Sequence, residues 1–204
     1  MLLAGSQGLF VNSMNCIGGI EGWLATSEES IAMYKGASVV LRPVQASDEP
    51  LLREWDNDVE LNALMGTEVL VDLKDHYNSW AGRNCVRLMI ETKLGVVIGN
   101  VDLIRIHWRL REAELVIRIG RRDYWNRGYG TDAVKVLLRV AFCHMKLNSV
   151  YLRVYRSNAR AVRCYEKCGF RKEGLVVRES PNGKVEIVLM RILASEYSKK
   201  AAAG

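Results

Sequence analysis

The residues whose types and spacing most clearly indicate a binding site form a short loop at positions 124–132, Tyr-Trp-Asn-Arg-Gly-Tyr-Gly-Thr-Asp. Two glycines two positions apart let the backbone turn tightly and bring several N–H groups toward one point. The helix expected to follow adds unpaired amides and a partial positive charge at its first turn. Arg127 adds a cation beside them. This combination predicts a binding site for an anionic group such as a diphosphate.

The Gly-Tyr-Gly tripeptide is weak evidence by itself, because a plain strand-to-helix turn has the same composition. No Gly-Lys-Ser/Thr follows at the spacing of a phosphate-binding Walker loop. Ala133 stands where a dinucleotide fingerprint has its third glycine. The sequence therefore argues against these two nucleotide-binding loops and leaves either another kind of anion site or a simple turn.

A second motif follows about thirty residues later, at positions 157–170. Asn158 stands where a strand gives way to a helix, so its side-chain amide can cap that helix or bind a ligand. Tyr165 lies two turns further along the helix. A phenol has a reference pKa of about 10, so this side chain holds a proton at neutral pH that it can donate. Tyr165 could equally be a packed core aromatic.

Together the two motifs resemble those of the GNAT superfamily of acetyl-CoA N-acetyltransferases. The stretches 124–131 and 158–170 look like the RimJ/RimL-like branch, the ribosomal-protein alanine acetyltransferases, as do Leu41-Arg42-Pro43 and the run 55–58. The resemblance covers roughly residues 38–193. Trp125 stands where many members have Gln or Arg, so we expect the phosphate grip to depend on backbone amides and Arg127.

The resemblance implies that acetyl-CoA, with no metal, lies where two strands, here 114–119 and 150–155, splay apart. Tyr165 would donate a proton to the leaving thiolate. Glu114 would act as the base or bind the substrate amine, although it could be an exposed strand-end carboxylate that pairs with Arg111. His107 is a weaker candidate for the base. The implied cofactor contacts are Arg118, Ile119, Asn126, Arg127, Gly128, Tyr129, Gly130, Thr131, Asn158 and Tyr165.

Other residues that could do chemistry have simpler explanations. His76 and His144 read as surface or helix-face residues. The five cysteines lack the spacing of a disulfide framework and read as reduced thiols. Cys164 and Cys168 could share a helix face, where we favour buried packing over metal binding.

Hydrophobic periodicity predicts the elements that position these residues. The clearest helix has an apolar stripe at three- and four-residue steps over 131–145. A further helix should begin near Ser47–Pro50 and bury Leu51, Leu52 and Trp55. The remaining expected helices are 72–81 and 158–168, with Gly169 as a C-cap, and the expected strands are 39–41 (ending at Pro43), 86–91, 96–103, 114–119, 150–155, 176–178 and 185–191.

This element order predicts an α+β fold of α/β/α layers. Its centre is a mixed, mostly antiparallel sheet of about six to seven strands with a splayed pair, and helices cover both faces. We expect an N-terminal extension at 1–36, the N-acetyltransferase domain at 37–197 and a C-terminal tail at 198–204.

The composition fits one such domain. Of the 204 residues, 49% are hydrophobic, and the net charge of +6 suits an anionic ligand without requiring one. The basic residues are spread along the chain and no nucleic-acid motif is present, so we expect no nucleic-acid partner. No apolar run reaches membrane-span length, and the start lacks the basic segment of a secretory signal, which favours a cytoplasmic protein. A homodimer is compatible with the resemblance.

Three functions remain open at this point. The first is acetylation of the α-amine of a protein or peptide, which the RimJ/RimL-like motifs favour. The second is acetylation of a small amine such as a polyamine, an amino sugar or an aminoglycoside, which the positive net charge weakly opposes. The third is a module that binds CoA without catalysis.

Overall fold

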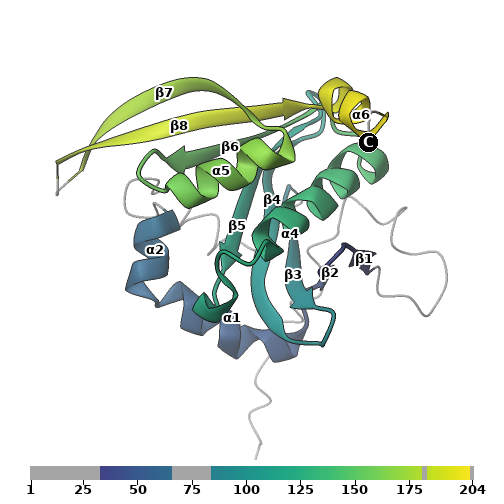
Figure 1. Ribbon diagram of the computed structural model, residues 1–204, viewed down its shortest axis with the longest axis vertical. Helices are drawn as coiled ribbons and strands as arrows, with labels where there is room; N and C mark the ends of the chain where they lie inside the picture. Colours follow the sequence, from purple (N-terminus) through teal and green to yellow (C-terminus); the bar gives the residue numbers. More distant parts are fainter. Residues whose placement is uncertain (1–32, 66–83, 181–182, 203–204) are drawn as a thin grey trace, which may run out of the picture.

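In the computed structural model, which describes residues 33–65, 84–180 and 183–202, the strands form one twisted sheet (Figure 1). The strand order is β1-β2-β3-β4-β5-β6-β8-β7. Every neighbouring pair is antiparallel except β5 and β6, which are parallel. The strands are β1 (Tyr34–Lys35), β2 (Val39–Pro43), β3 (Val86–Thr92), β4 (Val97–His107), β5 (Glu112–Ile119), β6 (Ser149–Tyr155), β7 (Arg171–Ser180) and β8 (Gly183–Leu193).

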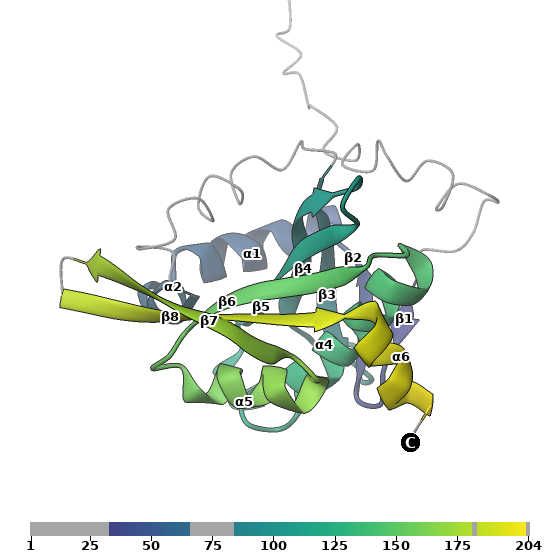
Figure 2. The ribbon, with the colours of Figure 1, turned by 90° about the horizontal axis from the view of Figure 1, so that it is seen from above.

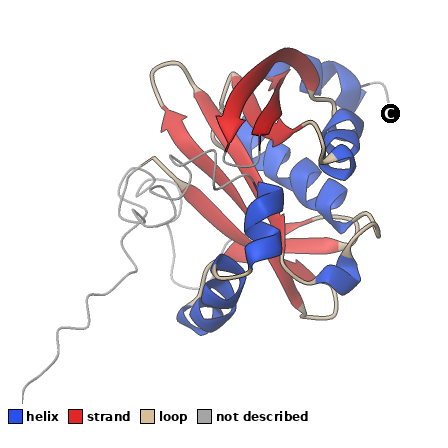
Figure 3. Ribbon diagram, turned by 90° about the vertical axis from the view of Figure 1, so that its left-hand side faces the viewer, coloured by secondary structure: helices blue, strands red, loops and turns tan. Residues whose placement is uncertain are grey.

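Helices cover both faces of the sheet, with α1 on one side and α5 on the other (Figure 2). The same layering is visible in Figure 3, where helices are blue and strands red. The α-helices are α1 (Glu49–Asp56), α2 (Val59–Met65), α4 (Tyr129–Arg139), α5 (Ala159–Cys168) and α6 (Ala194–Ala202). Short 3-10 turns precede α1 (Ala46–Asp48) and α4 (Arg122–Tyr124), and a π turn, Val140–His144, follows α4. The expected α+β class is confirmed.

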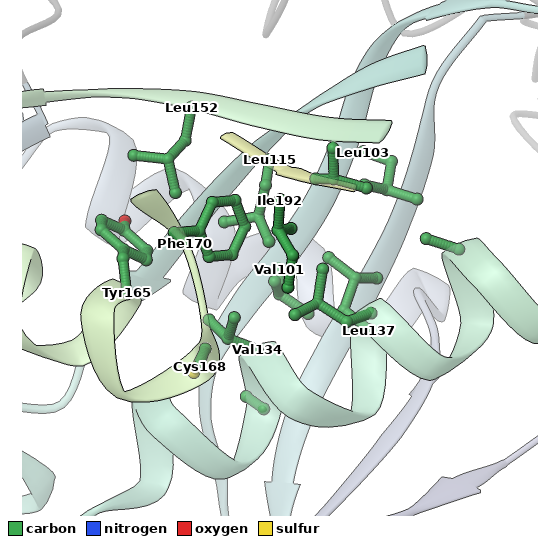
Figure 4. Packing of buried hydrophobic residues seen from close by; sticks show 14 of the residues in the cluster. Val101, Leu103, Leu115, Val134, Leu137, Leu152, Tyr165, Cys168, Phe170 and Ile192 are labelled. Carbon is green, nitrogen blue, oxygen red and sulfur yellow. The ribbon is translucent and has the colours of Figure 1, made fainter. Parts of the chain in front are cut away.

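The main core lies between the sheet and the α4–α5 layer (Figure 4). The stripe predicted for α4 supplies Val134 and Leu137 to it, and both side chains are fully buried. Alternate residues of β3 face opposite ways: Ile90 enters this core, whereas Met89 packs with Trp55 of α1 on the other face. This alternation is what a sheet buried on both faces requires.

The parallel pair β5–β6 separates soon after it forms. The strands pair only at Glu112–Ser149, Ala113–Val150 and Glu114–Tyr151. Beyond Glu114, β5 stays paired with β4 as far as Ile119, and β6 stays paired with β8 as far as Tyr155. The splayed pair expected from the family resemblance is therefore present, and we call this opening the fork.

Several elements differ from the sequence prediction. The sheet has eight strands in the described residues, because Tyr34–Lys35 pairs with β2. The described chain also contains α2 and α6, which we did not predict. The helix predicted to run to Met145 leaves α-helical geometry after Arg139. The predicted helix 72–81 and the turn at Pro181–Asn182 lie outside the described residues.

Two of these unpredicted elements, β1 and α6, do not fit within the expected domain limits. β1 falls inside the proposed extension 1–36, and α6 crosses the proposed limit at residue 197. The division itself stays a prediction. Among the described residues, no helix is long and apolar enough to cross a bilayer.

Asp132, in the first turn of α4, holds the turn between β1 and β2. Its carboxylate accepts hydrogen bonds from the backbone N–H groups of Ala37 (3.1 Å), Ser38 (2.6 Å) and Val39 (3.0 Å). Burial opposes ionisation of this carboxyl, but these hydrogen bonds outweigh it and lower the pKa of Asp132. The carboxylate thereby joins the start of α4 to the edge of the sheet.

Candidate active site

A pocket of about 280 Å³ lies at the fork between β5 and β6. Four segments supply most of its walls: β5, the loop 124–131, the end of β6 and the pocket-facing side of α5. The C-terminal half of α2 supplies the rest. Its lining includes Leu61, Leu64, Met65, residues 114–119, Tyr124, Trp125, Asn126, Gly128, Gly130, Thr131, residues 153–155, Asn158, Arg160, Ala161, Arg163, Cys164, Tyr165 and Lys167.

The pocket is lined from both faces of the sheet. Leu115 belongs to the core under α4 and α5, whereas Arg118 on the same strand bonds Asp56 of α1 on the opposite face. Tyr165 of α5 lines the pocket from the first face, and Leu64 of α2 lines it from the second. Because the strands are separated at this point, a ligand held on one face can meet a second reactant from the other.

The backbone of the predicted anion-binding loop is accessible beside its two glycines. Gly128 caps α4 in a left-handed conformation with φ 85°, and Asn126 also has a positive φ of 59°. No atom lies within 4 Å of where a Cβ of Gly128 would stand, and only Ile119 comes within that range at Gly130. The space beside both glycines is therefore free, as a ligand approaching the amides at the start of α4 requires.

Trp125 ties this loop to the end of β5. Its indole N–H donates to the carbonyl of Ile119 at 2.7 Å. Its ring also packs against the cluster formed by Leu52, Trp55 and other residues between α1, α2 and β3. The guanidinium carbon of Arg160 lies 3.9 Å from the centre of the indole. The residue that departs from the family pattern thus supports a cation from α5.

Asn158 performs the capping role that its position predicted. Its Oδ1 accepts from the backbone N–H of Ala161 at 3.1 Å, and its Nδ2 lies 3.5 Å from the carbonyl oxygen of Leu64. The side chain also lines the pocket. It therefore fixes the start of α5 and lies against α2.

Tyr165 is nearly fully buried and its ring packs edge-on against Phe170, with centroids 5.8 Å apart. Figure 4 shows these two rings together at one end of the core cluster. Tyr165 also lines the pocket. The core packing and the acid role are thus compatible, because the ring is held by the core at the wall of the pocket.

Glu114 is buried, so it is not the exposed carboxylate that we considered, and it pairs with two other arginines in place of Arg111. It is 1% exposed, and Arg153 donates to it from Nε at 2.8 Å and from Nη2 at 3.2 Å. Arg105 also donates to it. Glu114 and Arg153 both line the pocket, at the point where the two strands part. The error arose because both arginines lie on other strands, β4 and β6, and reach Glu114 only through the pairing of the sheet.

The side chain of Arg118 is held by protein groups. Its Nε donates to Oδ1 of Asn100 at 3.0 Å, and its Nη1 donates to Asp56 at 2.6 Å. Together with Ile119, it lines the pocket. The carbonyl of Ile119 already accepts the Trp125 bond, so the expected backbone contacts to a ligand would involve other groups along this strand.

The cysteine pair lies at the junction of α4 and α5. Thr131 Oγ1 is 3.3 Å from Sγ of Cys164, and Cys168 Sγ donates to the carbonyl of Thr131 at 3.5 Å. The hydrogen bond from Cys168 lowers the pKa of Cys164 to about 7, with a smaller contribution from Thr131 and against an opposing effect of burial. Cys164 lines the pocket, so the packing prediction overlooked a thiol in contact with the site.

The pocket brings together most of the predicted site residues. Those that line it are Glu114, Arg118, Ile119, Asn126, Gly128, Gly130, Thr131, Asn158 and Tyr165. The side chain of Arg127 is exposed and that of Tyr129 packs on Tyr124, with ring centroids 5.4 Å apart, and neither lines the pocket.

Sequence reasoning missed Arg153 and Arg160 as pocket residues. Arg160 belongs to the second motif, and this position could have identified it as a pocket residue. His107 and His144 are exposed and do not line the pocket. His76 lies outside the described residues. No group of three metal-ligating side chains occurs among the residues that the structure describes.

Comparisons with known proteins agree with this geometry. A family model described as an acetyltransferase (GNAT) domain matches residues 38–171. The chain belongs to the GNAT acetyltransferase family. Accordingly, this GNAT protein is an acyltransferase that uses acetyl-CoA to acetylate an amine.

Within the family, the chain is similar to enzymes that acetylate small amines. The GNAT chain is 33% identical over 133 residues to spermidine N(1)-acetyltransferase of Vibrio cholerae, which covers 64% of this chain and 76% of the relative. It is 26% identical over 198 residues to aminoglycoside N(6')-acetyltransferase type 1 of Klebsiella pneumoniae, covering 88% and 96%. These relatives do not support the expected RimJ/RimL-like branch.

A solved structure shows the same arrangement. The crystal structure of spermidine N-acetyltransferase from Vibrio cholerae in complex with CoA and spermine matches with a TM-score of 0.68 at 28% identity. The match covers 78% of this chain and 98% of that one. The overall GNAT fold is therefore shared.

Proposed function

We propose that this GNAT enzyme acetylates a primary amine of a small molecule, such as a polyamine or an amino-sugar compound, rather than a protein α-amine. The observation that carries the proposal is the similarity to spermidine and aminoglycoside acetyltransferases over 64% and 88% of the chain. The net charge of +6 is a weak objection, because net charge does not describe the potential inside a pocket.

The residues of the pocket have separate roles in this proposal. Bound acetyl-CoA supplies the thioester from which the acetyl group is transferred. The N–H groups at the start of α4, beside Gly128 and Gly130, bind its diphosphate. Asn158 fixes the start of α5 and so the position of Tyr165. The Tyr165 hydroxyl holds a proton at neutral pH for the thiolate that leaves.

Glu114 is better suited to hold the substrate amine than to remove its proton. Within the described part of the chain, at least three N–H donors from Arg105 and Arg153 already occupy this carboxylate. A carboxylate offers about four lone-pair sites, so roughly one remains for the substrate. We therefore assign amine binding to Glu114 and deprotonation of the ammonium to solvent.

The test is a thiol-release assay with acetyl-CoA and a panel of acceptors. The panel contains spermidine, spermine, an aminoglycoside, glucosamine and short peptides with a free N-terminal amine. The proposal predicts thiol release with at least one small amine and a kcat/KM for the peptides at least about tenfold lower. Product mass must rise by one acetyl group on the acceptor.

Two results would contradict the proposal. Peptides that react faster than every small amine would restore the protein α-amine as the acceptor. CoA binding without thiol release for any acceptor would indicate a binding module. The variant Tyr165→Phe serves as the control for enzyme-dependent release, since spontaneous acetylation does not depend on the phenol.

A further inference from the structure

Arg160 differs from Arg163, which also lines the pocket without an ion pair in the described residues, because Arg163 is exposed whereas Arg160 packs on an aromatic ring. It is half-buried, and it forms no hydrogen bond or ion pair with another residue in the described part of the chain. Its main contact there is the indole of Trp125, at 3.9 Å from the ring centre. Arg122, the other guanidinium near that ring, is already paired with Asp58 (2.9 Å) and Glu60 (2.8 Å).

The indole is a rigid support for this guanidinium. The 2.7 Å bond to the Ile119 carbonyl fixes one edge of the ring, and the cluster around Leu52 and Trp55 packs against it. A guanidinium stacked on an aromatic face loses little rotational freedom when it later binds an anion, because it is already ordered. Trp125 therefore orients Arg160.

Arg160 and the accessible backbone at the start of α4 line the same pocket. Arg160 lies in the first turn of α5, and Gly128 and Gly130 lie at the start of α4. A half-buried guanidinium has lost part of its hydration, which is why burial lowers the pKa of Arg160. An anion between the loop amides and this side chain would restore those lost interactions.

We propose that Arg160, stacked on Trp125, is the side chain that binds the diphosphate of acetyl-CoA. Its planar fork of donors matches phosphate oxygens, and charge-assisted hydrogen bonds of this kind are the strong ones. Arg127, which the sequence favoured for this role, is exposed and does not line the pocket. In this proposal α5 provides the side chain that Trp125, standing where many members have Gln or Arg, cannot provide. The inference rests on the use of acetyl-CoA and is independent of which amine is acetylated.

The test measures equilibrium binding of CoA to purified full-length variants by calorimetric titration, without any acceptor. Arg160→Gln should weaken CoA binding about 10- to 100-fold, as expected for loss of a charge-assisted contact. Arg160→Lys keeps the charge without the fork and should fall between Arg160→Gln and the wild type. Arg127→Gln should lose less than Arg160→Gln. Arg156→Gln, an exposed residue that lies near α5 and outside the pocket, should stay within about twofold of the wild type.

Two further measurements separate the diphosphate contact from a general loss of structure. Pantetheine, which lacks the phosphates, should bind Arg160→Gln and the wild type equally. Trp125→Leu should weaken CoA binding in the wild type but add little in the Arg160→Gln background, because the indole acts through the guanidinium. Melting of each variant without ligand checks the fold.

The proposal is overturned if folded Arg160→Gln binds CoA within about twofold of the wild type, or if Arg127→Gln loses more. It is also overturned if pantetheine binding falls by the same factor as CoA binding. Each of these results leaves the acceptor question untouched, since no acceptor is present. Conversely, failure to acetylate small amines would leave the CoA titrations valid.

Discussion

The side chains of the pocket fall into two groups according to their partners. Arg118 is held by an ion pair to α1 and Glu114 by ion pairs to arginines of β4 and β6, so both shape the pocket, although our proposal leaves one acceptor position of Glu114 for the amine. The indole-supported Arg160 and the open amides beside Gly128 and Gly130 have groups available to a ligand. The lining has one carboxylate and five cationic side chains, so the pocket is basic, and the division supports our proposal that it holds a diphosphate while its buried charges stay compensated.

The phenol of Tyr165 gives the most direct prediction for catalysis at this scale. Tyr165→Phe keeps the ring that packs on Phe170, so the fold and CoA affinity should be preserved. Loss of a positioned acid should lower kcat about 100-fold or more. Steady-state kinetics with acetyl-CoA, together with CoA titration, checks both parts. An unchanged kcat would remove the acid role from Tyr165.

Cys164 gives a prediction about pH. With a pKa of about 7, its thiolate fraction should rise steeply between pH 6 and 8 and level off above that range. Alkylation by iodoacetamide, followed by peptide mass spectrometry, should show this profile at Cys164. Saturating CoA should slow the reaction, because Cys164 lines the pocket. Alkylation that CoA does not slow would mean that the thiol is reached from outside the site.

The structural roles of single residues could be predicted where the signal was local, while their contacts with a cofactor stay a prediction. Asn158 and Gly128 act within their own motifs, where helix entry and a positive φ are set by nearby sequence. Glu114 could not be understood in this way, because its partners Arg105 and Arg153 are brought to it only by sheet pairing. The support of Arg160 by Trp125 likewise joins two motifs that are separate in sequence.

The elements around the pocket depend on α4 being correctly docked. Asp132 connects its first turn to the β1–β2 turn, and Gly36 there has no room for a side chain, since a Cβ would lie 2.6 Å from the Asp132 carboxylate. Periodicity predicted α4 and most strands. It could not predict β1, which is two residues long and exists because Tyr34 pairs with Leu41 and Lys35 pairs with Val40 of β2.

Asp132→Asn tests this connection. The substitution weakens hydrogen bonds to a charged acceptor and should cost about 1.5–3 kcal/mol of the free energy of unfolding at pH 7. The folded-state pKa of Asp132 is lowered, so its stabilisation is present above the unfolded pKa of about 4 and is lost as pH falls below it.

Denaturant unfolding of both proteins from pH 7 to pH 3 measures this effect. The wild type should exceed Asp132→Asn by a constant amount above about pH 5, and the difference should shrink below about pH 4. A difference that stays constant down to pH 3 would contradict the assigned role of the carboxylate.

At the scale of the whole molecule, the fork is the feature that joins fold and function. A parallel pair, β5–β6, inserted in an otherwise antiparallel sheet separates after three residue pairs. The opening lies between the α4–α5 layer and the α1–α2 layer, and both contribute to one pocket. The family and its layered fold could be predicted from two short motifs. The acceptor class could not, because it depends on side chains contributed from several elements.

Thermal unfolding in the presence of CoA measures whether this pocket binds the acetyl donor. Ligand that binds only the folded state stabilises it by about 2.7 kcal/mol at a concentration of 100 times Kd. For a protein of this size, the thermal midpoint should rise by about 5–10 °C. The rise should be smaller for Arg160→Gln at the same CoA concentration. A midpoint that does not move at millimolar CoA would contradict the account.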